Sequence, residues 1–89
     1  MNKQQDTITL VNKDGRSIVF DIIAGIKIDS GFYLITTTND PEVQLDEGEA
    51  LVFKVVKKLL SNKESYELET DDAVLDKVFA EYDRLLDAQ

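Results

Sequence analysis

The chain contains no cysteine and no histidine, and these two absences exclude most familiar sites of enzyme chemistry. Without cysteine there is no disulfide framework and no thiol nucleophile, and without histidine there is no imidazole base and no Cys/His zinc site. No apolar run approaches the roughly 18 residues that a membrane-spanning helix needs, and the N-terminal residues lack the apolar stretch of a secretory signal. We therefore expect a cytoplasmic protein that is not an enzyme and uses no cofactor or metal.

Positive charge is scarce. The 89 residues include 18 Asp and Glu against 10 Lys and Arg, which gives a net charge of −8. A surface of this sign repels phosphate, so direct binding to nucleic acid is not expected. At 43% hydrophobic and 31% charged residues the chain has enough apolar surface to fold. Its length suits one core, so residues 1–89 are interpreted as a single domain.

Alternating polar and apolar residues predict short β-strands, separated by turn residues such as Asn, Asp and Gly. The predicted strands are 7–11, 17–23, 32–37, 50–58 and a short 65–69. Gly25 is interpreted as a bulge or bend near the end of the second strand, and the register of 32–37 is left open by its pattern. Residues 1–6 are expected to be disordered, and 38–49, which contain the sole proline, to form an acidic loop.

Residues 71–88 are predicted to form one amphipathic helix, because apolar side chains recur at helical spacing after an Asp-rich start that suits a helix N-terminus. The apolar stripe is Val74, Leu75, Val78, Phe79, Tyr82, Leu85 and Leu86. The expected docking face of the sheet carries Ile8, Leu10, Ile18, Phe20, Leu51, Phe53 and Leu68. The predicted fold is therefore α+β: a four- to five-stranded, mostly antiparallel meander with one C-terminal helix packed on one face.

The opposite face of this sheet is a candidate interaction face, because a contiguous apolar patch rimmed by charge often marks an interaction site. Its residues are Val19, Ile23, Val52, Lys54, Val56 and Lys58. The alternative is that these are scattered valines on a wet face, with the lysines keeping the sheet soluble. If the face is exposed, Val52→Lys combined with Val56→Lys would leave the thermal midpoint nearly unchanged and abolish association with an as yet unknown protein partner or with a second copy. The chain is accordingly expected to be a monomer or a weak homodimer.

The carboxylates of the acidic loop could bind a hard cation such as calcium. They are Asp40, Glu42, Asp46, Glu47 and Glu49. Their spacing around Gly48 does not match an EF-hand loop, so a solvated loop is expected instead. General acid–base catalysis would also need a cleft that shifts carboxyl pKa values, and one helix on one sheet offers little concave volume.

The order of these signals resembles the YrzB-like family of small acidic domains from Gram-positive bacteria. The resemblance covers about residues 7–86 and rests on Lys-Asp-Gly, Val-Phe-Asp-Ile, Gly-Phe-Tyr-Leu-Ile, Ala-Leu-Val-Phe-Lys-Val and the closing helix. It implies no catalytic or ligand-binding residue. Two functions remain: a non-catalytic protein–protein interaction or adaptor module, and a nucleic-acid-associated or nucleic-acid-mimicking protein. Salt separates them, because binding by acidic groups weakens steeply with salt whereas an apolar contact does not.

Overall fold

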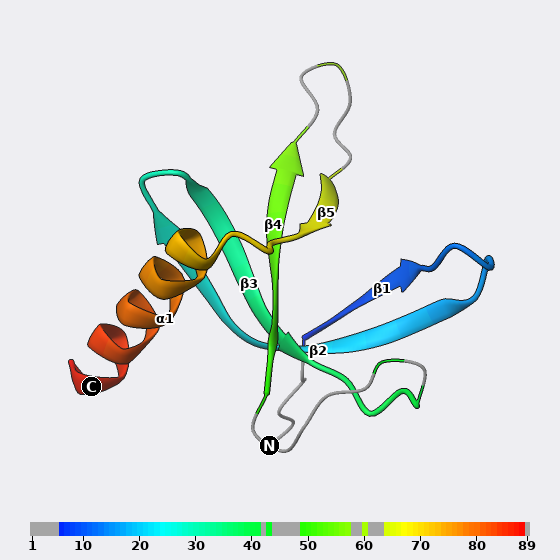
Figure 1. Ribbon diagram of the computed structural model, residues 1–89, viewed down its shortest axis with the longest axis horizontal. Coiled ribbons are helices and arrows are strands. Elements are labelled where there is room, and N and C mark those ends of the chain that lie inside the picture. The colour runs from blue at the N-terminus through cyan, green and yellow to red at the C-terminus, as the bar shows by residue number, and fades with distance from the viewer. Residues whose placement is uncertain (1–5, 42, 44–48, 58–59, 61–63, 89) are drawn as a thin grey trace.

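The computed structural model describes residues 6–41, 43, 49–57, 60 and 64–88. Over these residues the chain forms a five-stranded antiparallel sheet and one α-helix (Figure 1). The elements are β1 (Thr7–Val11), β2 (Ser17–Ile28), β3 (Gly31–Thr37), β4 (Leu51–Lys57), β5 (Glu64–Leu68) and α1 (Asp72–Asp87). Each strand pairs with its neighbours in sequence, in the order β1-β2-β3-β4-β5. The predicted α+β meander with a C-terminal helix is confirmed.

The turn between β1 and β2 follows from its residues. The amide of Gly15 donates to the carbonyl of Asn12 at 3.0 Å, and Gly15 has a φ of 82°. The Asn12 side-chain oxygen also accepts bonds from the amides of Asp14 at 2.9 Å and Arg16 at 3.0 Å. A left-handed glycine that closes a short hairpin loop is the arrangement that Asn-Lys-Asp-Gly favours. The turn fixes the register, so that Ile8 lies opposite Phe20.

β2 continues to Ile28 instead of ending at residue 23, and it contains a β-bulge. The pairing with β3 shifts between Ile22 and Ala24, which leaves Ile23 as the extra residue. One inserted residue reverses the alternation of side chains along a strand. Even-numbered residues before and after the bulge therefore point to opposite faces: Ile22 joins one apolar cluster, and Ala24 joins another.

Gly25, predicted to mark a bulge or bend, lies inside β2 directly after the bulge, and it also allows a close contact. A Cβ atom built on Gly25 would lie 2.8 Å from Cζ of Phe32. Lys27, two residues further along β2, pairs with Phe32 of β3. The absent side chain therefore lets the Phe32 ring lie across the backbone of β2, a close approach that only glycine allows without rearrangement.

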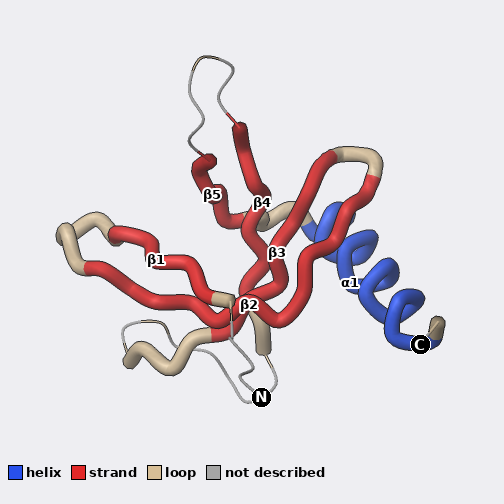
Figure 2. Tube along the Cα trace, turned by 180° about the vertical axis from the view of Figure 1, so that it is seen from behind, coloured by secondary structure: helices blue, strands red, loops and turns tan. Residues whose placement is uncertain are grey.

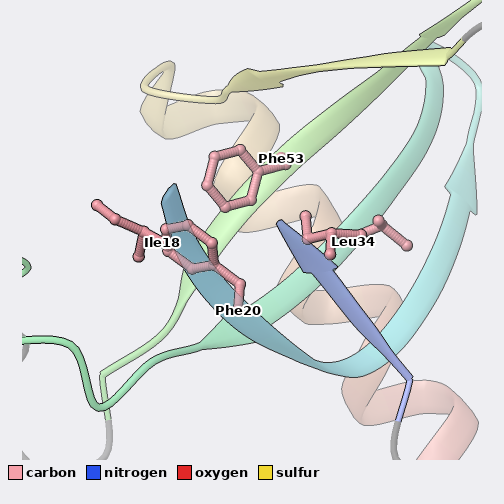
Figure 3. Packing of buried hydrophobic residues seen from close by; sticks show 5 residues of the cluster. Ile18, Phe20, Leu34 and Phe53 are labelled. Atoms are coloured by element: carbon pink, nitrogen blue, oxygen red, sulfur yellow. The ribbon is translucent and has the colours of Figure 1, made fainter. Parts of the chain in front are cut away.

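The sheet curls into an open half-barrel and carries an apolar cluster on each face (Figures 1 and 2). On the face that we call the inner face, the buried residues are Ile8, Ile18, Phe20, Leu34 and Phe53. The rings of Phe20 and Phe53 meet edge to face with centroids 5.1 Å apart, although β3 separates their strands (Figure 3). On the opposite, outer face the buried residues are Ile26, Tyr33, Ile35 and Val52, together with Val78 of α1.

The helix begins where the sequence predicts, because the Asp71 side chain accepts hydrogen bonds from the amides of Ala73 at 2.9 Å and Val74 at 3.4 Å. It docks, however, on the outer face rather than on the expected inner face. Val78 is fully buried there. The prediction was wrong because the second half of β2, with the reversed alternation, was not recognised as strand.

Only part of the predicted apolar stripe is covered. Val74, Leu75, Val78 and Tyr82 contact the outer-face cluster, whereas Phe79 and Leu85 are each 38% exposed and Leu86 is 48% exposed. Figure 2 shows the C-terminal end of α1 extending beyond the strands.

The N-terminal residues 1–6 were expected to be disordered. Residues 1–5 lie outside the described residues, but Asp6 is ordered, since its carbonyl accepts a hydrogen bond from the amide of Ile22 at 2.8 Å.

Candidate interaction surfaces

The residues of the predicted interaction face do not form one surface. Val52 is 2% exposed and lies beneath α1, so the expectation that it is exposed is wrong. Val19 and Ile23 are 52% and 49% exposed. Lys54 and Val56 are half-buried, and Lys58 lies outside the described residues.

The bulge in β2 explains this division. Val19 and Ile23 belong to the half of β2 that precedes the reversed alternation, whereas α1 covers Ala24, Ile26 and Ile28 beyond it. What remains of the predicted face on β2 is two exposed apolar side chains, with Asp21 between them in sequence.

Lys54 of the predicted face and the nearby Lys57, which was not part of that prediction, are placed by their strand partners. Lys54 lies opposite Glu67 in the β4–β5 register, and the Lys57 ammonium lies 3.9 Å from a carboxylate oxygen of Glu64. An exposed ion pair such as that of Lys57 with Glu64 contributes little to stability. Each of these two lysines therefore has a glutamate of β5 as its strand partner.

Among the described residues no helix covers the inner face, whose central side chains are buried by the curl of the sheet. α1 packs on the other side, and Val43 of the 38–49 loop is a described residue that contacts the inner cluster. Half-buried side chains surround the buried cluster: Leu10, Ile22, Leu51, Val55 and Tyr66. At the β5 edge of this face Leu68 is 51% exposed, whereas Val11, which follows the inner-facing Leu10 in edge strand β1, is 67% exposed and points to the other side of the strand.

The two edge strands that bound the half-barrel differ in charge. β1 has the sequence Thr-Ile-Thr-Leu-Val, with no charged residue, whereas β5 contains Glu64 and Glu67. Neither strand pairs with a second neighbour among the described residues. An edge without charge or proline is an unprotected template for another strand. Sequence reasoning missed this site, although the signal, an uncharged strand at the end of a meander, was present.

A groove of about 530 Å³ lies between α1 and the β2–β3 hairpin end. Its lining residues are Lys27, Ile28, Asp29, Ser30, Lys77, Ala80, Glu81 and Arg84. The Arg84 guanidinium binds both carboxylate oxygens of Glu81, with Nε donating at 2.9 Å. The hydrogen bond lowers the pKa of Glu81 and raises that of Arg84. A lowered carboxyl pKa is opposite to what a general acid at neutral pH requires.

The acidic loop is only partly described. Asp40 forms an ion pair with Arg16, with the guanidinium Nη2 3.1 Å from a carboxylate oxygen. Glu42, Asp46 and Glu47 lie outside the described residues. Among the residues that the structure describes, no three carboxylates gather in a way that could hold a metal ion. Within the same residues, no helix has the length and apolarity to span a membrane.

The chain is similar over its whole length to a bacterial protein. It is 31% identical over 91 residues to the UPF0473 protein of Alkaliphilus oremlandii (strain OhILAs), and the match covers 100% of this chain and 99% of that relative. No family model matches the sequence, and no solved structure matches it significantly. The relative's name states no activity, ligand or partner.

Proposed function

The chain belongs to the UPF0473 family, and because that name states no activity, we propose from the chain's own residues that it is a non-catalytic protein–protein interaction or adaptor module of the bacterial cytoplasm. The finer assignment to the YrzB-like family stays a prediction. The observation that carries the proposal is the half-barrel, whose apolar inner face ends at two exposed edges. Exposed apolar side chains at such an opening are typical of a surface that another protein covers.

The absence of catalysis is part of the proposal. In the groove between α1 and the β2–β3 turn, one cation and one carboxylate are already joined, since Arg84 binds Glu81. The hydroxyl of Ser30, which also lines the groove, shares a hydrogen bond of 3.0 Å with the Tyr33 hydroxyl. The chain has no histidine to activate a serine. We therefore expect purified protein to show no hydrolytic activity toward ester or phosphoester substrates.

Photo-crosslinking in living bacteria tests the proposal. Benzoylphenylalanine is placed separately at Leu68 and at Val11, which are exposed on the two edge strands β5 and β1, and at Asp83 on the exposed side of α1 as the control position. We expect adducts with another protein from the edge-strand positions and none from Asp83. If neither edge-strand position gives an adduct while the variants fold normally, the proposed function is wrong.

A second candidate, a nucleic-acid-mimicking protein, is favoured by one observation on α1. Four exposed aspartates, Asp72, Asp76, Asp83 and Asp87, lie on the solvent side of the helix. At about 3.6 residues per turn they fall within about 60° of one another. Such a stripe could occupy a basic groove meant for phosphate.

The same crosslinking experiment separates the two candidates. A mimic should give its adduct from Asp83, with a partner whose affinity falls steeply as salt rises. An apolar contact at an edge strand should give adducts from Val11 or Leu68 and change little with salt. An adduct from Asp83 alone would replace the proposed function by this second candidate.

A further inference from the structure

The backbone of β1 has hydrogen-bonding groups that no described strand uses. The carbonyl of Asp6 and the amide of Asn12 both bond toward β2, to Ile22 and Arg16 respectively. In an antiparallel ladder, residues that bond inward alternate with residues that point outward. The inward set therefore includes residues 6, 8, 10 and 12, and the amides and carbonyls of Thr7, Thr9 and Val11 point away from the sheet.

The side chains of β1 do not protect this edge. Natural edge strands carry charges, prolines or bulges that prevent pairing with another chain. β1 has none of these among its five residues, although 31% of the whole chain is charged. The opposite edge, β5, has Glu64 in an ion pair with Lys57 and the exposed Glu67. The lack of charge is therefore a local property of β1.

The position of β1 determines what an added strand would cover. Ile8 and Leu10 of β1 point to the inner face, and Leu10 is only half-buried. A strand paired with β1 would lie about 4.8 Å beyond it and place alternate side chains over the same face. Apolar side chains there would extend the inner cluster from Leu10 across the opening toward Leu68, which is 51% exposed on the far rim.

We propose that the free edge of β1 binds an extended segment of a partner protein, with apolar side chains at alternate positions and lysine or arginine at its ends. This inference rests on the proposed function and names the partner's chemistry. The net charge of −8 attracts a cationic segment and opposes the approach of a second copy of the same charge. Main-chain bonds to Thr7, Thr9 and Val11 supply the pairing, and alternate apolar side chains supply the selection.

Amide hydrogen exchange with a defined peptide tests the inference. The peptide is acetyl-Lys-Lys-Val-Thr-Val-Thr-Val-Lys-Lys-amide, added to the purified full-length protein. We expect exchange at Thr7, Thr9 and Val11 to slow at least about tenfold at saturating peptide, because these amides become paired. The amide of Ile8 is already paired with β2 and should change little. A peptide with glutamate in place of its lysines should bind much more weakly.

Two variants at one position provide the matched comparison. Thr9→Pro removes an outward amide without removing a bond to β2, since proline is tolerated where the N–H faces solvent. Thr9→Ser keeps that amide. Both variants should have thermal midpoints near that of the natural chain. In Thr9→Pro the peptide should no longer slow amide exchange at Thr7 and Val11, whereas in Thr9→Ser it should still do so. Equal protection in both variants would overturn the proposed mode of binding.

The remaining outcomes are also decisive. If the three amides are protected without peptide and the protection rises with protein concentration, β1 pairs with a second copy and the proposed partner is wrong. If crosslinks form in cells at Val11 or Leu68 but the cationic peptide protects nothing, the interaction function stands and the strand addition at β1 is refuted.

Discussion

Replacing Val52 by alanine tests where the helix docks. Val52 is 2% exposed and lies in the cluster that Val78 of α1 completes. Removing two buried methyl groups should cost about 1 to 3 kcal/mol, because lost burial and a residual cavity both contribute. For a domain of 60–100 residues, a loss of about 2 kcal/mol lowers the thermal midpoint by about 8 to 16 °C.

The measurement is urea unfolding followed by far-ultraviolet circular dichroism, with thermal melts in parallel. Val19→Ala is the matched control, since it removes the same two methyl groups from a side chain that is 52% exposed. It should cost less than about 1 kcal/mol, mostly through β-propensity. If the two variants lose equal stability, the helix does not cover Val52 and the assignment of the two faces is wrong.

The same reasoning reverses the outcome that the sequence predicts for Val52→Lys combined with Val56→Lys. A lysine at a fully covered position must leave water without a partner, which costs several kcal/mol. The double variant should therefore unfold at a much lower temperature instead of keeping its midpoint. A midpoint within a few degrees of the natural chain would instead favour an exposed outer face.

Three further changes test local features. Gly25→Ala should lower the free energy of unfolding by about 1 to 2 kcal/mol, because the new methyl group meets the Phe32 ring. The loss should disappear in a Phe32→Ala background, and an unchanged loss there would contradict the contact. Asp71→Ala should lower the free energy of unfolding by about 1 kcal/mol, because the helix loses its N-cap, whereas Asp71→Asn, which still caps, should lower it much less. Equal unfolding midpoints for the two variants would argue against the cap. Arg84→Gln should raise the pKa of Glu81 toward its ordinary value, measured by carbon-13 NMR titration of the Glu81 carboxyl. Because the folded pKa is lowered, the stabilisation from this ion pair is present above the unfolded pKa and is lost as pH falls through the folded value.

Local chemistry made most of the fold predictable. Gly15 and Asn12 determined the first hairpin, and Asp71 with the residues that follow determined the helix. These are short-range signals, in which the residue type and the backbone conformation depend on each other. The face on which the helix docks depends instead on long-range pairing, which the alternation of a single strand does not reveal.

The candidate site was predicted only in part for the same reason. Ile22, Ile23 and Ala24 are consecutive apolar residues, so the sequence does not show which one is inserted. Reading the strand as ending at residue 23 left Val52 on a face that appeared uncovered. Val19 and Ile23, which precede the reversed alternation, were correctly expected to be exposed.

The bulge at Ile23 makes the length of β2 a determinant of the whole architecture. If Ile23 were paired in the ladder instead of bulging, strict alternation would point Ile26 toward the inner face instead of toward the helix. A substitution at this position changes one exposed side chain, whereas the loss of one residue between the bulge and Ile26 would turn the rest of the strand to the opposite face. Within the family, natural variation should therefore be free in the identity of residue 23 and strict in the number of residues from Ala24 to the end of β2.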